Sequence, residues 1–309
     1  MNNCKVCNGP LAEGFMVREM MLGKRDEFEY AQCTNCGTIQ ILEIPKNIED
    51  YYPEYYYSFK EDIPLIKRLS GSKRLFNKYR IKRKYREQNI PIFRYLKPLK
   101  TTPSSRILDI GCGRGKLICE MFNLGFENVQ GVDKFVTAEY DYDYGVKVLK
   151  KDLSELENKR YNLLMMHHVF EHMDEPLEEL KKCFELLKSK GYLIIRIPVV
   201  GRAWDIYGKD WIQLDAPRHF FIHTEKSMTL LAERAGFEIA NIIYDSAGFQ
   251  FWGSELYKRD IALVENTTKN YRIDTDFFSD EELRIYDQQA KDLNDARKGD
   301  QAIFYLRKL

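Results

Sequence analysis

From residue 105 onward the chain alternates strand-like and helix-like segments, and this alternation constrains the fold more than any other feature. YNLLMM, for example, is nearly all apolar, as expected of a strand covered on both faces. KLICEMFNLGF and TEKSMTLLAERAG carry apolar residues at helical spacing and meet a glycine at the end. The seven strand-like segments are RILDI, VQGVD, VKVLKKD, YNLLMM, YLIIRIPV, FEIANIIY and QAIFYLRK. The sequence therefore predicts an α/β fold with a doubly wound, mainly parallel, seven-stranded sheet.

The rest of the chain divides into two further regions. With 309 residues, of which 44% are hydrophobic, the chain can fill a proper core. We predict a small cysteine-containing module over residues 1–45 and a tyrosine-rich linker with a basic helix over 46–100. The α/β domain then occupies 101–309, with insertions at 198–223 and 245–299. Long insertions in α/β enzymes tend to shape substrate sites.

Four of the seven cysteines form two C-x-x-C pairs near the N-terminus. The chain shows no apolar run of about 20 residues and no secretory signal, so we expect a cytoplasmic protein with reduced thiols. Paired thiols at this spacing predict a zinc ribbon with a structural Zn²⁺. A redox dithiol or a chance pairing without metal stays open. The expected metal ligands are Cys4, Cys7, Cys33 and Cys36.

A strongly basic segment follows the tyrosine-rich linker. Between Lys67 and Arg86 there are ten Lys or Arg residues and no acidic residue, with apolar residues at helical spacing. The whole chain has a net charge of only +1, which argues against a general nucleic-acid binder. The basic helix could contact RNA, nucleotide diphosphates or an anionic membrane surface, or could be a solvated face. No transmembrane segment is expected.

The stretch ILDIGCGRGKLI places three glycines where the first strand of the α/β domain meets its helix. In open parallel sheets a ligand lies at this turn, and glycine lets it approach the backbone closely. Asp109 precedes the glycines; a carboxylate there repels phosphate and suits a cationic or hydroxyl-rich ligand. The spacing fits neither the G-x-G-x-x-G fingerprint of dinucleotides nor a P-loop.

These residues resemble the first motif of the class I S-adenosylmethionine-dependent methyltransferases, which have a Rossmann-like fold. Asp133 stands about 20 residues after the glycines, where an acid can accept both ribose hydroxyls of an adenosine. In the family an acid after the third strand meets the adenine, which implies Asp152, with Leu153 as a backbone contact. The segment YNLLMMHHVFEHMDEPLEEL also resembles the family's fourth strand and the helix after it. The cofactor-binding residues implied by the resemblance are Asp109, Gly111, Cys112, Gly113, Asp133, Lys134, Asp152, Leu153 and His168.

Methyl transfer to an alcohol or an acidic carbon also requires a base, and histidine is the expected residue. The five histidines fall in two places: after the fourth strand and in the segment DAPRHFFIHT. We predict His219 as the general base and His223 as the second candidate, because this insertion lies where the methyl group should point. Either histidine could instead only hold the loop in place. Glu171, His172 and His219 could also jointly hold a divalent ion.

The cysteine module and the aromatic segments resemble bacterial methyltransferases of surface-polysaccharide or nucleotide-sugar pathways. The resemblance implies a sugar or nucleotide-sugar acceptor. In sugar C-methyltransferases with such a module the catalytic histidine follows a glutamate, whereas Arg218 precedes His219 here. O- and C-methylation therefore both stay open. The alternatives are an RNA methyltransferase that uses the zinc ribbon and the basic helix, and a non-catalytic cofactor-binding module.

Overall fold

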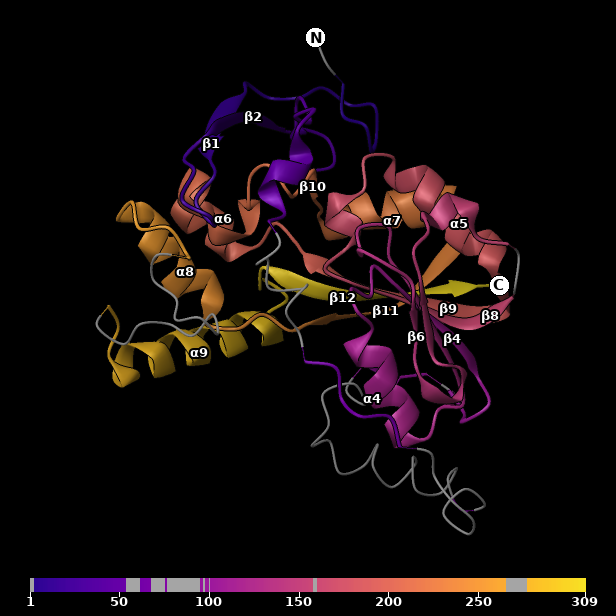
Figure 1. Cartoon of the computed structure of the whole chain (residues 1–309). Coiled ribbons are helices and arrows are strands. Elements are labelled where there is room, and N and C mark those ends of the chain that lie inside the picture. The colour runs from indigo at the N-terminus through magenta and orange to yellow at the C-terminus, as the bar shows by residue number, and fades with distance from the viewer. Residues whose placement is uncertain are drawn as a thin grey trace.

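A computed structural model of the chain describes residues 3–53, 62–67, 76, 95–96, 98–99, 101–157, 160–264 and 277–309. Within them, the strands form one eight-stranded sheet, in the order β11-β12-β9-β8-β4-β5-β7-β6, and one four-stranded sheet, in the order β1-β2-β3-β10 (Figure 1). The strands of the larger sheet are β4 (Arg106–Ile110), β5 (Asn128–Val132), β6 (Tyr140–Asp141), β7 (Lys147–Leu149), β8 (Tyr161–His167), β9 (Leu187–Pro198), β11 (Phe237–Tyr244) and β12 (Gln301–Lys308).

The larger sheet is mostly parallel and Rossmann-like, as the sequence predicts. β4 pairs in parallel with β5 and β8, β5 with β7, and β8 with β9. β11, β12 and β6 join antiparallel at the two ends. The sheet has eight strands instead of the predicted seven, because the two-residue strand β6 adds an edge that is too short to leave an apolar pattern.

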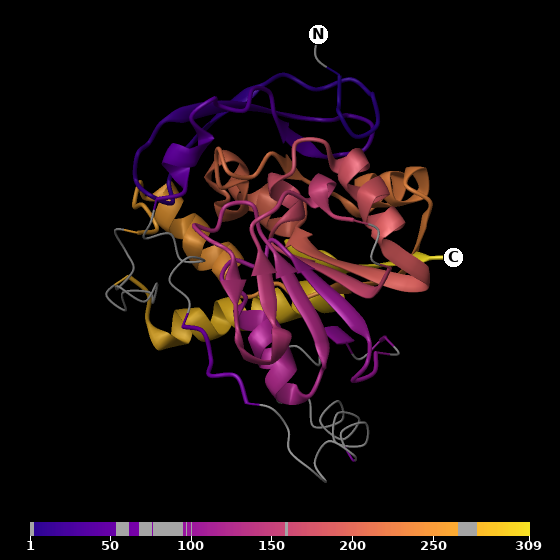
Figure 2. The same ribbon diagram turned by 45° about the vertical axis from the view of Figure 1, so that its right-hand side comes forward.

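Helices cover both faces of this sheet, and alternate residues of each strand point to opposite sides. On β4, Ile107 packs with α4 on one face, while Leu108 packs with α5 and α7 on the other. Figure 2 shows α4 below the strands and the N-terminal region across the top. The helices are α4 (Lys116–Leu124), α5 (Pro176–Leu186), α6 (Arg202–Tyr207), α7 (Glu225–Arg234), α8 (Phe249–Lys258) and α9 (Asp280–Asp295). None of the helices in the described ranges is long and apolar enough to cross a bilayer.

Most predicted elements are found where the sequence indicates them, but some boundaries are shifted; VKVLKKD, for example, forms a strand only over Lys147–Leu149. The helix predicted over DEPLEELKKCFELLKSKG ends at Leu186, and residues 187–191 already belong to β9. Leu187 is buried and pairs with Tyr161 on β8, ahead of a register shift in this pair of strands. Residues 187–191 therefore form a strand because they pair with β8, although their apolar spacing also fits a helix.

The four-stranded sheet combines the N-terminal module with a strand from far along the chain. Its first strands are β1 (Phe15–Arg18), β2 (Glu27–Gln32) and β3 (Ile39–Ile41). The fourth, β10 (Phe221–Ile222), lies in the insertion after β9 and pairs antiparallel with β3. Val199 and His223 form a parallel bridge at the end of β9, so this insertion connects the two sheets.

Short 3-10 helices complete the described structure, and they include η1 (Ile48–Tyr51), η3 (Asp143–Gly145), η4 (Leu153–Glu155), η5 (Phe170–His172), η6 (Gly208–Asp210) and η7 (Ile212–Leu214). Most of the predicted basic helix between Lys67 and Arg86 and most of the tyrosine-rich linker lie outside the described residues. The part of the linker that is described includes Tyr51 and Tyr52, which lie beside the functional site.

Candidate functional site

A cavity of about 340 Å³ lies at the carboxyl ends of β4, β5, β7 and β8. This is the edge at which open α/β sheets bind ligands. The nine residues predicted to bind a cofactor all line it: Asp109, Gly111, Cys112, Gly113, Asp133, Lys134, Asp152, Leu153 and His168. They come from four different strand ends, so the fold is what brings them together.

The glycines after β4 allow a backbone path that other residues would not follow. Gly111 has φ +66°, and a Cβ built on it would lie 2.4 Å from a methyl group of Val169. Gly115, with φ +87°, stands directly before α4, and a Cβ there would lie 2.6 Å from Val148. A side chain at either position would be strained and would collide with its neighbour. The tight backbone path of this turn therefore requires glycine at both positions.

Asp133 is fixed over this turn by backbone amides. Gly113 N donates to Asp133 Oδ2 at 2.9 Å, and Phe135 N donates to Oδ1 at 2.8 Å. Each carboxylate oxygen can still accept a further hydrogen bond. The carboxylate at the tip of β5 is thus tied to the glycine turn and lines the cavity beside it.

Asp152 both lines the cavity and caps η4. Its Oδ1 accepts from Ser154 N, and its Oδ2 lies 3.3 Å from Lys134 Nζ. Burial tends to raise the pKa of Asp152, but the hydrogen bonds from Ser154 and the charge of Lys134 outweigh it and lower the pKa. Asp152 is therefore an ionised carboxylate, and part of its hydrogen-bonding capacity is already used by the chain.

The cavity also contains residues that the sequence analysis did not single out. The ring of Tyr52, from the linker, stacks on Phe135 with 5.7 Å between ring centroids, so this N-terminal segment forms one wall. Glu179 of α5 faces the same space, and burial raises its pKa to about 7. The aromatic run YYPEYYYS was the only signal for Tyr52; nothing in the sequence set Glu179 apart from other helix-surface acids.

The two predicted catalytic histidines lie behind the cavity wall instead of lining it. His219 is 7% exposed, and its ring lies 4.9 Å from that of His172, which does line the cavity. His223 is completely buried between the rings of Phe170 and Phe221. Burial lowers the pKa of each of the two histidines to about 4. Both rings are therefore neutral near pH 7.

Comparisons with known proteins agree with this arrangement. Residues 78–242, more than half of the chain, match the family described as "Methyltransferase domain". The chain belongs to this methyltransferase family. The membership confirms the enzyme class and the Rossmann-like fold expected from the sequence.

Individual relatives are more distant. The chain is 33% identical over 97 residues to a ubiquinone biosynthesis O-methyltransferase of Rickettsia bellii, covering 29% of this chain and 40% of the relative. It is 24% identical over 152 residues to a tRNA U34 carboxymethyltransferase of Helicobacter pylori, covering 44% of this chain and 58% of that protein. The chain thus spans about half the length of these relatives. A methyltransferase structure from Archaeoglobus fulgidus superposes with a TM-score of 0.43 at 21% identity, covering 77% of this chain and all of that one.

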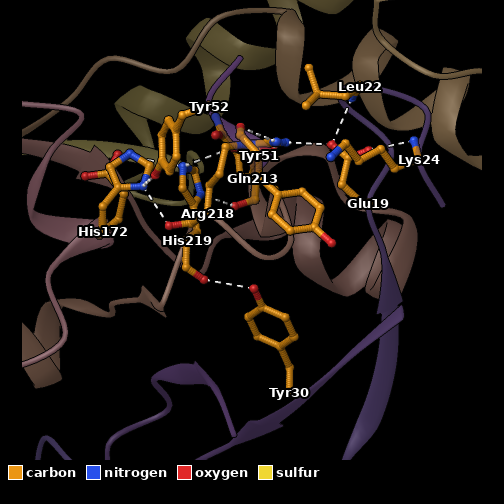
Figure 3. A network of polar contacts seen from close by, with 12 residues as sticks. Glu19, Leu22, Lys24, Tyr30, Tyr51, Tyr52, His172, Gln213, Arg218 and His219 are labelled. Carbon is orange, nitrogen blue, oxygen red and sulfur yellow. Dashed lines mark hydrogen bonds and ion pairs between the residues drawn. The ribbon is translucent and has the colours of Figure 1, made fainter. Parts of the chain in front are cut away.

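The methyltransferase domain is joined to the N-terminal module by a buried arginine. The guanidinium of Arg218 is bound by Asp215, by Glu19 Oε1 at 3.0 Å and by the carbonyl oxygen of Tyr51 at 3.2 Å (Figure 3). Arg218 and Glu19 are both completely buried. Nearby, Tyr30 of β2 donates to the carbonyl oxygen of His219 at 3.0 Å. The module therefore holds the loop that carries His219 in place beneath it.

The four N-terminal cysteines converge on one point of the module. Their sulfurs lie within 4.8 Å of one another, with Cys4 and Cys36 3.7 Å apart and Cys7 and Cys33 3.5 Å apart. All four are free thiols. A hydrogen bond from the Cys4 thiol lowers the pKa of Cys36 to about 4, which favours the thiolate form that metal ions bind. The cluster has the composition of a four-sulfur metal site.

Proposed function

We propose that this protein transfers a methyl group from S-adenosylmethionine to a small polar acceptor. The observation that carries the proposal is that all nine residues predicted to bind this cofactor line one cavity. The family match is to a methyltransferase domain and covers residues 78–242, which includes all nine of these residues. The glycine turn leaves the backbone bare, and Asp133 above it has room to accept the two hydroxyls of a ribose.

The charge of the cavity also favours this cofactor over a nucleotide phosphate. Its lining contains two lysines and five acidic residues: Asp109, Asp133, Asp152, Asp174 and Glu179. An excess of carboxylates stabilises a cation and repels phosphate. S-adenosylmethionine supplies a methyl group bound to a positively charged sulfur. The work left to the chain is to hold this group, align the acceptor with it and remove a proton from the acceptor.

For the group that acts on the acceptor, the geometry favours His219 over His223. His219 touches His172, which lines the cavity, whereas His223 stacks on Phe170 and Phe221, neither of which lines it. His219 also stands in the loop that the N-terminal module fixes through Tyr30. Because His219 does not line the cavity itself, it acts on the acceptor through His172, or through a proton or ion bound between the two rings.

We propose a sugar or a nucleotide sugar of a surface-polysaccharide pathway as the acceptor, methylated at oxygen or carbon. This part rests on the resemblance of the cysteine module and the aromatic segments. The relatives matched here are named for ubiquinone biosynthesis and for tRNA, so an acceptor screen must include phenolic compounds and tRNA besides nucleotide sugars. Methylation of tRNA alone would replace the sugar in this proposal.

We also propose that the cysteine cluster binds one structural Zn²⁺. With Zn–S bonds of about 2.3 Å, tetrahedral geometry places neighbouring sulfurs about 3.8 Å apart. The distances of 3.7 and 3.5 Å between sulfur pairs fit this value, whereas a disulfide would require about 2 Å. All four coordination positions would be filled by protein, which leaves no open position for chemistry.

Isothermal titration of the full chain with S-adenosylmethionine tests the proposal. We expect one site per chain, and we expect Asp133→Asn to weaken binding about 10- to 100-fold, because a charged hydrogen-bond acceptor is lost. The matched control is Asp141→Asn, an exposed acid that pairs with Lys147 at the start of β7, outside the cavity. Absence of binding by the folded wild-type chain would refute the proposal.

A further inference from the structure

Behind the cavity wall, three side chains of metal-ligating type converge on one point. One ligand atom from each of Glu171, His172 and His219 lies within 4.8 Å of the other two. Glu171 and His172 come from η5 after β8, and His219 comes from the insertion after β9. The three residues are separated in the sequence but are brought together by the contact between these two segments, in which Phe220 N donates to the carbonyl oxygen of Glu171 at 2.8 Å.

Glu171 has an unusual environment for a carboxylate. The residue is completely buried, and among the described residues neither of its oxygens accepts a short hydrogen bond. Its contacts are long and are to nitrogens of histidines: His168 Nδ1 at 3.5 Å and His219 Nε2 at 4.0 Å. Arg196 donates to His168 Nε2, so His168 Nδ1 carries the ring hydrogen and makes at most a weak hydrogen bond to Glu171. A buried carboxylate with so little hydrogen bonding is costly unless a positive charge compensates it.

The two histidine rings of this cluster are held in the tautomer that metal ligands need. His219 Nδ1 lies 2.7 Å from the carbonyl oxygen of Gln213, and His172 Nδ1 lies 2.7 Å from that of Arg218 (Figure 3). A carbonyl can only accept, so each Nδ1 carries a hydrogen and Nε2 is the ring nitrogen whose lone pair a metal ion can take. A hydrogen bond from the second ring nitrogen to a backbone carbonyl is the usual support of a metal-bound histidine.

Acceptor atoms therefore face one another at this point. His219 Nε2 points toward Glu171 Oε1 and also lies 3.7 Å from Asp215 Oδ2. A lone pair surrounded by carboxylate oxygens is satisfied only by a proton or by a cation between them. A proton can satisfy one such pair, whereas a cation can satisfy Glu171 and both imidazoles at once.

We propose that Glu171, His172 and His219 bind one divalent cation of the borderline type, such as Zn²⁺, Fe²⁺ or Mn²⁺. Two imidazoles and one carboxylate suit these ions, and three protein ligands leave coordination positions open. Because His172 lines the cavity, an open position would face the methyl acceptor. The inference rests on the proposed function in one respect: it assigns to that site an acceptor that binds the cation through an oxygen atom.

The test uses Mn²⁺, because thiolates prefer softer ions and a zinc-loaded cysteine cluster will not take it up. The full chain, stripped of metal and reloaded with one equivalent of Zn²⁺ for the cysteine cluster, is titrated with Mn²⁺, and free Mn²⁺ is followed by electron paramagnetic resonance. We expect one Mn²⁺ per wild-type chain. Glu171→Gln and His172→Asn should each weaken binding at least about tenfold. Asp141→Asn, which changes an exposed acid that pairs with Lys147 outside the cavity, should bind like wild type.

His172→Asn protects the test against misfolding, because His172 is only half-buried. Wild-type protein that binds no Mn²⁺ would overturn the inference and leave a proton as the group shared in the cluster. Equal binding by wild type and both cluster variants would also overturn it. Titration of the same samples with S-adenosylmethionine keeps the two proposals apart, because cofactor binding without Mn²⁺ binding contradicts only the cation site.

Discussion

Arg218 is the buried cation on which the N-terminal module and the histidine loop both depend. Replacement by methionine keeps the length of the side chain but leaves Glu19 and Asp215 buried without their counter-charge. Breaking a buried ion pair in this way costs about 3–5 kcal/mol. We expect Arg218→Met to lower the free energy of unfolding by that amount, measured by urea denaturation.

An exposed ion pair supplies the control for this substitution. Arg284 pairs with Glu281 on α9, and both side chains are more than 70% exposed. Arg284→Met should change the free energy of unfolding by less than about 1 kcal/mol. Similar effects of the two substitutions would mean that Arg218 does not have the central role described for it.

Asp300 is a second residue whose burial has a measurable effect. Its Oδ2 accepts from Trp211 Nε1 at 3.1 Å, and burial raises its pKa to about 7. The folded chain therefore favours the protonated form, so the stability linked to Asp300 is complete below about pH 4 and is lost as the pH rises through 7. Asp300→Asn cannot ionise and should lack this loss.

Urea unfolding at pH 5 and pH 8 measures the effect of Asp300. From pH 5 to pH 8, the free energy of unfolding of Asp300→Asn should rise relative to that of wild type by at least about 1.4 kcal/mol. This change corresponds to one pKa unit. The comparison uses the difference between the two proteins, so other titrating groups cancel. A difference that does not change with pH would contradict the raised pKa.

At the scale of elements, the first turn of α7 links the two sheets. Thr224 caps this helix by accepting from Ser227 N, and its hydroxyl donates to the carbonyl oxygen of Cys36 at 2.7 Å. Thr224→Ala should lose the cap, worth about 1 kcal/mol, and the hydrogen bond to the module, worth about another 1 kcal/mol. Ser279→Ala removes the similar cap of α9, in which Ser279 makes no hydrogen bond to the described part of the module, and should cost only the first amount. Equal losses in urea denaturation would show that the link to Cys36 contributes nothing.

Elements with a strong local pattern could be predicted from the sequence alone. RILDI, FEIANIIY and QAIFYLRK became strands with the expected bounds. The same local signals placed the predicted cofactor-binding residues at strand ends, and the parallel sheet brought them to one cavity. This part of the site is local in sequence, so it could be anticipated.

What could not be predicted depends on contacts between distant segments. β10 has only two residues and exists because it pairs with β3. Leu187 becomes part of a strand because Tyr161 lies opposite it. The positions of His219 and His223 behind the cavity wall depend on how the insertion folds under the module, which no local pattern encodes. Whether either of them acts as the base stays a proposal.

At the scale of the whole molecule, the cysteine cluster belongs to the same hydrophobic core as the methyltransferase domain. Cys4, Cys33 and Cys36 pack in one continuous cluster with Leu108 of β4. Removal of zinc with a chelator should therefore destabilise the whole chain, with the thermal midpoint lowered by at least about 5 °C, and zinc should restore it. Metal analysis should give one zinc per chain.

Two cysteine variants make this test specific. Cys36→Ser removes one of the four sulfur ligands and should abolish zinc binding. Cys183→Ala changes a buried cysteine of α5 that is not one of these four and should bind zinc like wild type. Well below one zinc per chain in wild-type protein purified without chelator would rule out the metal site. An apo protein as stable as the zinc form would show that the metal has no structural role.

The insertion strand β10 also affects how this architecture could be recombined. Phe221 and Ile222 form the last strand of a sheet whose other three strands precede residue 42. A chimera that moved only the cysteine-bearing segment onto another methyltransferase would leave β3 with an open edge, and the donor chain would keep an orphaned β10. Such edges invite pairing with other chains. In a chimera, the cysteine-bearing segment and the loop with His219 should therefore be exchanged together.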